Sequence, residues 1–224
     1  MREMLRVDGI RVVIKGFVIL RGVSFDVPPG GLIGLVGRNG AGKTTTLKSI
    51  IGIVPVVAGI ISMEGDDLLS VPGHRRARMG IGYMPEDRRL IGRLTVEENI
   101  LMPAWAGRAG AVEERLSYIY RIMPEVGTMA RRRASALSGG QQKMVALARA
   151  VMSGTRLLLL DEPFEGLSPA MGDRLAATIR QLRTDGASVC MAESDLKRIG
   201  FADEIFTIER GEIAPTSSSA SSKR

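Results

Sequence analysis

The stretch Leu32-Ile-Gly-Leu-Val-Gly37-Arg-Asn-Gly-Ala-Gly42-Lys43-Thr44 decides the fold of this chain. Its apolar beginning is typical of a buried strand, and the loop that follows fits the pattern G-x-x-x-x-G-K-[ST]. A helix is expected next, which is the context that the pattern requires. Glycines let backbone N–H groups turn inward around an anion, and a helix N-terminus adds partial positive charge. The stretch therefore predicts a phosphate-binding loop between a strand and a helix.

This loop supplies candidate ligands for a nucleotide and for its magnesium ion. Lys43 would reach the terminal phosphates, and the Thr44 hydroxyl would hold Mg²⁺. The residues expected around the phosphates are Gly37, Arg38, Asn39, Gly40, Ala41, Gly42, Lys43, Thr44 and Thr45. The structural alternative is a glycine-rich turn without a ligand, which the strand–loop–helix context disfavours.

A second motif, Arg156-Leu-Leu-Leu-Leu-Asp161-Glu162-Pro163, ends an apolar run in two carboxylates. Ligands of open α/β sheets bind at the carboxyl ends of the strands, so these acids are expected at the ligand site. Asp161 suits the magnesium ion, and Glu162 is placed to polarise a water that attacks the γ-phosphate. Strands also end in acids simply to meet solvent, so the motif gains its meaning from the phosphate loop upstream.

Further strands are expected where short apolar segments alternate with helical patterns. The expected strands are residues 5–7, 12–14, 23–27, 59–63, 81–84, 157–160, 188–192 and 204–208. Alternation of strands with helices predicts an α/β fold, in which helices cover a parallel or mixed sheet.

From residue 93 to residue 150 the pattern becomes mostly helical. Thr95 and Glu98 are the two ends of a capping-box sequence that opens one helix. A second helix is expected over residues 113–123, and Ser138 can cap a third that runs to residue 151.

These segments predict one domain over residues 1–214. Its sheet core spans residues 1–92 and 151–214, with antiparallel strands near the N-terminus, and a helical lobe over residues 93–150 is inserted into the core. The serine-rich residues 215–224 are expected to be disordered.

Composition places the chain among globular proteins with an aliphatic core. Of its 224 residues, 45% are hydrophobic and 4% are aromatic, and the formal net charge is +7. This charge suits nucleic acid, anionic lipid or a nucleotide, although a solvated basic surface is the simpler explanation. The single cysteine, Cys190, excludes an internal disulfide, and neither a signal peptide nor an apolar run of about 20 residues is evident. We therefore expect a soluble chain that contacts a membrane through a partner.

The segment Leu137-Ser138-Gly139-Gly140-Gln141-Gln142 resembles the signature of ATP-binding-cassette proteins, and its position between the phosphate loop and the acidic strand is that of the family. The resemblance covers about residues 3–213 and implies a RecA-like P-loop NTPase core. It also implies that two such domains pair head to tail. In such a pair Ser138, Gly139, Gly140 and Gln141 would contact the nucleotide of the second ATPase subunit. In the structural alternative, Ser138 only caps a helix.

Within the family, the chain looks most like the ATPases of branched-chain amino acid importers. Residues 84–89 and 94–100 resemble that group's coupling loop, and residues 157–169 resemble its acidic strand and the loop that follows. The likeness implies ATP hydrolysis at the cytoplasmic face of the inner or plasma membrane. It implies transmembrane permease subunits as direct partners and a substrate-binding protein as an indirect one. No nucleic acid partner is expected.

Three positions of the implied site differ from the family's common pattern. Glu86 stands where glutamine is usual, and it either offers an oxygen to magnesium or the attacking water or is a plain surface acid. Ser194 stands at the switch position, which usually carries histidine, and a serine lacks the imidazole's charge. Ile14 stands where an aromatic usually stacks on adenine, with Phe17 as either a substitute or a core residue. The expected catalytic residues are Glu162, Lys43, Glu86 and Ser194, and the expected metal ligands are Thr44, Asp161 and Glu86.

Two other functions stay open at this point. One is a soluble ATPase of the same fold that acts on ribosomes or nucleic acid, although such proteins usually join two cassettes or carry long insertions. The other is a regulatory nucleotide-binding protein that hydrolyses little. Ile14 and Ser194 favour this second alternative, whereas Lys43, Asp161 and Glu162 argue against it.

Overall fold

A six-stranded sheet forms the centre of the computed structural model, which describes residues 3–106 and 111–214. Its strands are β3 (Leu32–Val36), β6 (Ile81–Met84), β7 (Leu157–Asp161), β8 (Ser188–Glu193), β9 (Glu204–Glu209) and β10 (Glu212–Ile213). They follow the order β10-β9-β3-β8-β7-β6, and every neighbouring pair except β9 and β10 is parallel. The carboxyl ends of β3, β7 and β8 therefore meet at one edge, where ligands of open α/β sheets bind.

A second sheet is antiparallel. Its strands are β1 (Leu5–Ile14), β2 (Phe17–Val27), β4 (Ala58–Met63) and β5 (Asp66–Asp67), in the order β2-β1-β4-β5. The prediction of separate strands over residues 5–7 and 12–14 was wrong, because both segments belong to β1, and β2 begins well before residue 23. Gly9 has a φ of 60°, and the register shifts between Val7 and Ile10. This bulge interrupts the apolar alternation from which strand length is predicted.

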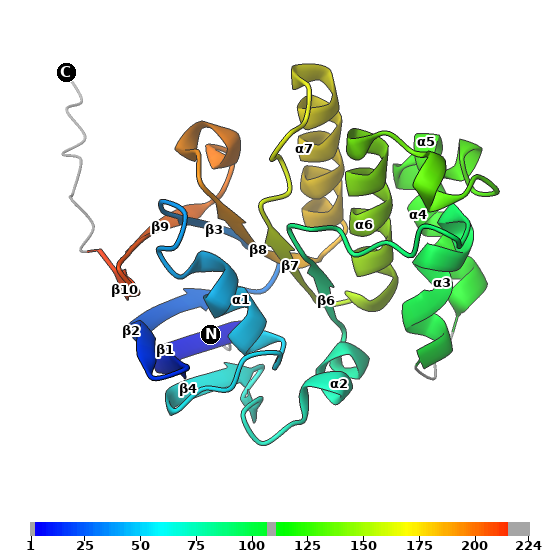
Figure 1. Ribbon diagram of the computed structural model, residues 1–224. Helices are drawn as coiled ribbons and strands as arrows, with labels where there is room; N and C mark the ends of the chain where they lie inside the picture. The colour runs from blue at the N-terminus through cyan, green and yellow to red at the C-terminus, as the bar shows by residue number, and fades with distance from the viewer. Residues whose placement is uncertain (1–2, 107–110, 215–224) are drawn as a thin grey trace.

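Helices pack on both faces of the central sheet (Figure 1). The first, α1 (Lys43–Ile50), contacts β2, β7 and β8 and so lies between the two sheets. On the other face, α6 (Gly139–Ser153) contacts β6 and β7 and runs beside α7 (Pro169–Thr184). The helices packed on α6 are α3 (Val96–Ala106), α4 (Val112–Ile122) and α5 (Pro124–Thr128). Shorter elements are α2 (Gly73–Arg76) and the 3₁₀ turns η1 (Ala77–Met79), η2 (Ala134–Ala136) and η3 (Leu196–Ile199).

The leucines of β7 serve two hydrophobic cores. Leu158 and Leu160 belong to the core formed with α6 and α7, whereas Leu157 and Leu159 belong to the core between the sheets. Successive residues of a strand point to opposite faces, so a strand buried on both faces has a continuous apolar sequence. The strand is thereby fixed on both sides, and it carries Asp161 to the edge of the sheet.

The helix starts agree with the sequence. The Thr95 N–H and hydroxyl both donate to Glu98 Oε2, and the Glu98 N–H donates to Thr95 Oγ1, which confirms the capping box before α3. The helices expected over residues 113–123 and from Ser138 onward correspond to α4 and α6. The very short α2, β5 and β10 were not predicted, because so few residues carry no periodicity. Residues 215–224, predicted to be disordered, lie outside the described residues.

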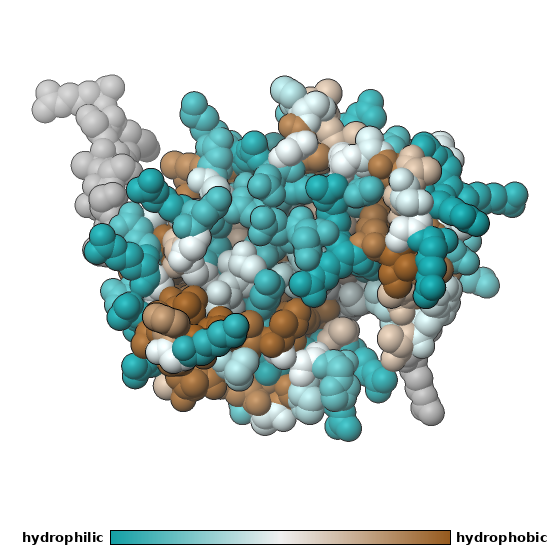
Figure 2. Space-filling view, in the orientation of Figure 1, coloured by the Kyte–Doolittle hydropathy of each residue, from teal (hydrophilic) through white to brown (hydrophobic). Residues whose placement is uncertain are grey.

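Among the described residues, no helix is both long and apolar enough to cross a membrane. On the face shown in Figure 2, apolar surface gathers over the antiparallel sheet, whereas hydrophilic residues surround the carboxyl ends of the central strands. Exposed large apolar side chains of the chain include Ile53, Val57 and Ile60, the last of which lies on β4. The hydrophilic part of the surface suits a charged ligand.

Candidate nucleotide site

The loop between β3 and α1 requires glycine at two positions. Gly42 has a φ of 117°, and a Cβ there would lie 2.7 Å from Leu20 Cδ2. At Gly37, a Cβ would lie 2.3 Å from the carbonyl oxygen of Ile208. The helix α1 begins directly after this loop without a side-chain cap, so the N–H groups of its first turn are available to an anion.

Lys43 is buried among partners from three segments. Its ammonium donates to the carbonyl oxygens of Gly37 at 2.7 Å and of Arg38 at 3.3 Å. It also donates to Ser194 Oγ at 3.1 Å and forms an ion pair with Glu162 Oε1 at 3.1 Å. These contacts hold the charge of Lys43 between the phosphate loop and the ends of β7 and β8.

Asp161, the last residue of β7, accepts hydrogen bonds from two other elements. Thr44 Oγ1 on α1 donates to Oδ1 at 2.9 Å, and the Tyr83 hydroxyl on β6 donates to Oδ2 at 3.2 Å. Burial raises the pKa of Asp161, and these hydrogen bonds oppose the rise only in part. A cation bound here would offset the desolvation of the carboxylate. Hydroxyl and carboxylate oxygens fit Mg²⁺, which takes one or two protein carboxylates together with phosphate oxygens.

Glu162 has a left-handed backbone with a φ of 46°, which is uncommon for a residue other than glycine. The Ser194 hydroxyl donates to its Oε1 at 2.5 Å, and the Ser194 N–H donates to its Oε2 at 3.1 Å. Burial by itself would raise the pKa of Glu162, but hydrogen bonds from Ser194, Glu193 and Lys43 outweigh burial and keep this pKa below its ordinary value. The carboxylate is therefore ionised and can accept a hydrogen bond from water.

The sequence interpretation missed Glu193, the last residue of β8. Its side chain is buried, and Oε1 accepts a hydrogen bond from the Phe164 N–H at 2.9 Å. Burial, and then the charge of Glu162, raise the pKa of Glu193 to about 8, although the Phe164 bond opposes the rise. The prediction ended this strand at Ala192, one residue too early, so Glu193 was not recognised as an acid at the end of a strand. A carboxylate directly after an apolar run was the available signal.

A cavity of about 630 Å³ brings many of the predicted residues together. Its lining includes Asn39, Gly40, Gly42, Lys43, Thr44, Thr45, Glu86, Glu162 and Ser194, together with Ile19, Glu165, Glu193, Asp195 and Arg198, which the sequence interpretation did not single out. Ile14 is absent from this lining in the part of the chain that the structure describes, and it pairs with Phe17 at the end of β1. Phe17 is 74% exposed, so the alternative of a core position for Phe17 was wrong.

The signature residues lie at the start of α6, outside the lining of this cavity. The Gln141 N–H donates to Ser138 Oγ at 3.3 Å, and the Ser138 N–H donates to Gln141 Oε1 at 3.0 Å. Ser138 therefore caps α6, which agrees with the structural role that the sequence offered as the alternative to nucleotide binding. Ser138 and Gly139 are exposed, so this helix start is accessible from outside the chain.

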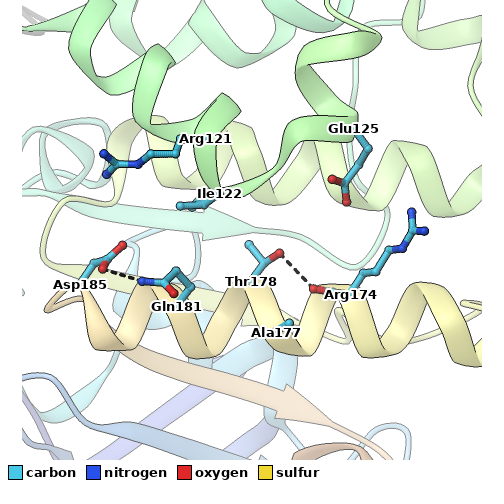
Figure 3. A pocket seen from close by; sticks show the side chains of 8 residues that line it. All are labelled: Arg121, Ile122, Glu125, Arg174, Ala177, Thr178, Gln181 and Asp185. Carbon is cyan, nitrogen blue, oxygen red and sulfur yellow. Dashed lines mark hydrogen bonds between the residues drawn. The ribbon is translucent and has the colours of Figure 1, made fainter.

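A second hollow of about 650 Å³ lies between α7 and the segment formed by α4 and α5 (Figure 3). Its charged lining residues are Arg121, Glu125, Arg174 and Asp185. The charges are of both signs, and the lining contains no residue of the predicted site. This hollow is therefore separate from the nucleotide cavity.

Comparison with known proteins gives the same family as the sequence motifs. Residues 20–165 match the family described as ABC transporter. The high-affinity branched-chain amino acid transport ATP-binding protein BraG of Pseudomonas aeruginosa is 35% identical over 211 residues, which are 94% of this chain and 91% of BraG. The lipopolysaccharide export system ATP-binding protein LptB of Escherichia coli K12 is 33% identical over 202 residues, which are 89% of this chain and 84% of LptB.

A solved structure described as an ATP binding subunit of an ABC transporter has the same fold. It superposes with a TM-score of 0.83 at 28% identity and covers 95% of this chain and 88% of its own. The predicted α/β P-loop NTPase fold is thereby confirmed.

Proposed function

Because this chain belongs to the ABC transporter family and is an ATPase of that family, we propose that it powers the import of branched-chain amino acids or of related amino acids and amides. The observation that carries the proposal is the cavity at the carboxyl ends of the central strands, where Lys43, Thr44 and Glu162 meet. A buried cation, a hydroxyl and an ionised carboxylate on the rim of a phosphate loop are the groups that phosphoryl transfer to water needs. The direction of transport and the class of solute rest on the likeness to BraG.

Three side chains of the cavity have roles that their contacts support. Lys43 would bind the terminal phosphate oxygens, because its ammonium already lies against the phosphate loop. Glu162 would accept a hydrogen bond from the attacking water and orient it toward the γ-phosphate. Ser194 would keep that carboxylate in place through its two hydrogen bonds. Catalysis of this type works by positioning and by charge neutralisation, without a covalent intermediate.

Mg²⁺, when bound, would neutralise charge that develops on the phosphates. Thr44 Oγ1 and Asp161 Oδ1 would hold it, since they lie 2.9 Å apart on neighbouring elements. Glu86 lines the same cavity and would add a further oxygen, either to the ion or to the attacking water.

The proposed working form is a dimer of ATPase subunits on the cytoplasmic side of a membrane. Ser138 and Gly139 are exposed and lie outside the chain's own nucleotide cavity, so they would be free to contact the nucleotide of the second subunit. The N-terminus of α6 supports this role, because such helix ends attract anions. Transmembrane permease subunits would be the direct partners, and a substrate-binding protein would deliver the solute.

Two observations favour functions other than the proposed import. The likeness to LptB supports an ATPase subunit of an export system instead of an importer. Ser194 in the switch position and Ile14 in the adenine position support a regulatory protein that binds nucleotide and hydrolyses little. The two experiments below separate these candidates from the proposed importer.

The first experiment is magnesium-dependent ATP hydrolysis by the purified chain, beside Lys43→Ala and Glu162→Gln. Activity that rises faster than linearly with protein concentration and vanishes in both variants supports the dimeric ATPase. ATP binding by the parent without turnover, also after addition of its permease subunits, would instead support the regulatory candidate.

The second experiment is uptake of labelled leucine by cells of the source organism that lack the gene for this chain. Uptake should fall, and it should be restored by the parent chain but not by Glu162→Gln. Normal leucine uptake in those cells, together with loss of an exported lipid or polysaccharide, would overturn import in favour of export.

A further inference from the structure

Lys143 is a buried cation outside the lining of the nucleotide cavity. It lies in the second turn of α6 and is only 2% exposed. Its Nζ donates to the main-chain carbonyl oxygen of Glu162 at 2.5 Å. Two lysines therefore hold Glu162, because Lys43 binds the carboxylate and Lys143 binds the backbone of the same residue.

Stability is a poor reason for a lysine at this position. Removing an ammonium from water costs several kcal/mol, and apolar residues of similar volume often replace buried charges without loss of stability. Burial accordingly lowers the pKa of Lys143, while the charges of Glu165, Glu193 and Glu162 oppose this decrease. A methionine would fill nearly the same space without the cost of desolvation.

The carbonyl group that Lys143 binds belongs to a residue with a strained backbone. Glu162 has a φ of 46°, its N–H donates to Ala192 O at 2.9 Å, and its carbonyl oxygen also accepts from the Glu165 N–H at 3.2 Å. Such a conformation persists only where the surroundings over-determine it. The Lys143 bond is one of the contacts that fix this peptide, and the peptide sets the direction in which the Glu162 side chain leaves the backbone.

We propose that Lys143 is a positioning residue that transmits the placement of α6 to the carboxylate of Glu162. The helix that carries Lys143 begins at Gly139, next to Ser138. The segment that would contact the nucleotide of a second subunit is thus joined to the carboxylate that would act on the chain's own nucleotide. The two nucleotide sites of a dimer are then coupled within each chain. This inference rests on the proposed roles of Glu162 and of the dimer.

The test compares the steady-state ATP hydrolysis of Lys143→Met with that of the parent. We expect kcat to fall about tenfold or more, since small misplacements of a catalytic group cost up to about 100-fold. The KM for ATP should stay within about twofold, because Lys143 does not line the cavity. The Hill coefficient for ATP should fall toward that of independent sites, and Tm should not decrease. Lys143→Gln keeps a donor on a slightly shorter side chain, so its kcat should be intermediate.

Two controls accompany these variants. Arg156→Met removes a cation directly before β7, where the side chain is 41% exposed, and it should leave kcat unchanged. In a Ser194→Ala background, which keeps the Glu162 carboxylate, Lys143→Met should lower kcat by a smaller factor than in the parent, because both residues act by placing that carboxylate.

A kcat within twofold of the parent in both Lys143 variants would overturn the proposal. Parallel losses of kcat and Tm in both variants, with the same loss of kcat in the parent and in the Ser194→Ala background, would assign Lys143 a purely structural role and overturn it as well. If Lys143→Met does not fold, Lys143→Gln decides by the same criteria. Full activity of Glu162→Gln by itself would instead refute the proposed role of Glu162.

Discussion

Ser194 binds both carboxylate oxygens of Glu162, since its Oγ lies 2.5 Å from Oε1 and its backbone nitrogen lies 3.1 Å from Oε2. The same hydroxyl lies 3.1 Å from Lys43 Nζ and 3.0 Å from Asn39 Oδ1. A side chain as short as serine reaches these groups because β8 lies between β3 and β7 in the parallel sheet. Ser194 thus connects the phosphate loop with Glu162.

Ser194→Ala should lower kcat by about 10- to 100-fold while the KM for ATP changes little. The substitution removes the hydroxyl bond to Glu162 but keeps the backbone bond. A hydrogen bond to a charged group is worth about 1.5–3 kcal/mol, and about 1.4 kcal/mol corresponds to tenfold in rate. Ser194→Thr keeps a hydroxyl and serves as the matched control in the same steady-state assay. An unchanged kcat in the alanine variant would show that the backbone N–H is sufficient to hold Glu162.

Glu193→Gln should make thermal stability less sensitive to pH between about 6 and 8.5. Burial and the charge of Glu162 raise the pKa of Glu193 from 4.5 to about 8, so the folded chain keeps a proton that the unfolded chain has lost. Stability from this group is complete below the unfolded pKa and is lost as the pH rises toward the folded pKa. Glutamine has no titratable proton. Its side-chain oxygen can still accept the hydrogen bond from the Phe164 N–H.

The measurement is Tm by calorimetry at matched ionic strength. Between pH 6 and 8.5 the Tm of the parent should fall more than that of the variant. Exposed Glu113, changed to Gln, is the control and should behave like the parent. Identical pH profiles for parent and Glu193→Gln would contradict the raised pKa.

Thr44→Val should raise the Mg²⁺ concentration needed for half-maximal ATPase activity by about tenfold. The substitution keeps the shape of the side chain but removes the hydroxyl that lies 2.9 Å from Asp161 Oδ1. Oxygen donors are what Mg²⁺ requires, and a methyl group offers none. Thr46→Val on the same helix is the control, because that hydroxyl only donates back to the Gly42 carbonyl. Equal Mg²⁺ titrations for the two variants would exclude Thr44 as a ligand.

Arg149→Met should loosen the segment of residues 85–92, which contains the strained residues Arg88 and Arg89. Arg149 on α6 donates to the Arg89 carbonyl at 2.7 Å and to the Arg88 carbonyl at 2.5 Å, and both of those residues have positive φ. Losing these bonds should cost about 1–3 kcal/mol. Each kcal/mol lowers Tm by about 2–4 °C in a domain of this size.

Hydrogen exchange of the backbone amides of residues 85–92 measures this effect directly. Exchange there should accelerate in Arg149→Met more than in the core strand β8, and Arg149→Lys should give an intermediate result. Unchanged exchange in this segment would show that other contacts hold it.

The residues that sequence reasoning identified are those whose roles follow from short-range geometry. The loop from Gly37 to Thr44 needs only a strand before it and a helix after it, and both can be predicted from local pattern. Lys143 could not be found in this way, because its partner, the Glu162 carbonyl, lies 19 residues further along the chain. Glu193 follows an apolar run, which is a local signal, but its contact with the Phe164 N–H is visible only in the structure. The bulge at Gly9 was missed for a related reason, since a bulge is defined by pairing with another strand.

Ile14→Tyr should tighten ATP binding if the nucleobase packs at this position. Ile14 is 38% exposed and pairs with Phe17, which is 74% exposed, so both side chains present apolar surface at the turn between β1 and β2. An aromatic ring adds about 0.5–1.5 kcal/mol to a stacked contact beyond the area that it buries. The Kd for ATP should therefore fall by about 2- to 10-fold, measured by isothermal titration calorimetry with the parent alongside.

Inorganic triphosphate provides the control for this prediction, because it carries the same phosphates without a base. Its affinity depends on the phosphate loop and Lys43, so the parent and Ile14→Tyr should bind it equally. If only the affinity for ATP increases in Ile14→Tyr, the residue at position 14 contacts the base. The parent chain then binds the base through a weaker contact than an aromatic side chain would give. Equal changes in the affinities for ATP and for triphosphate would show that the substitution acts on the phosphate loop. If neither affinity changes, the base packs against another surface. Ile19, which lines the cavity, is then the next position to substitute.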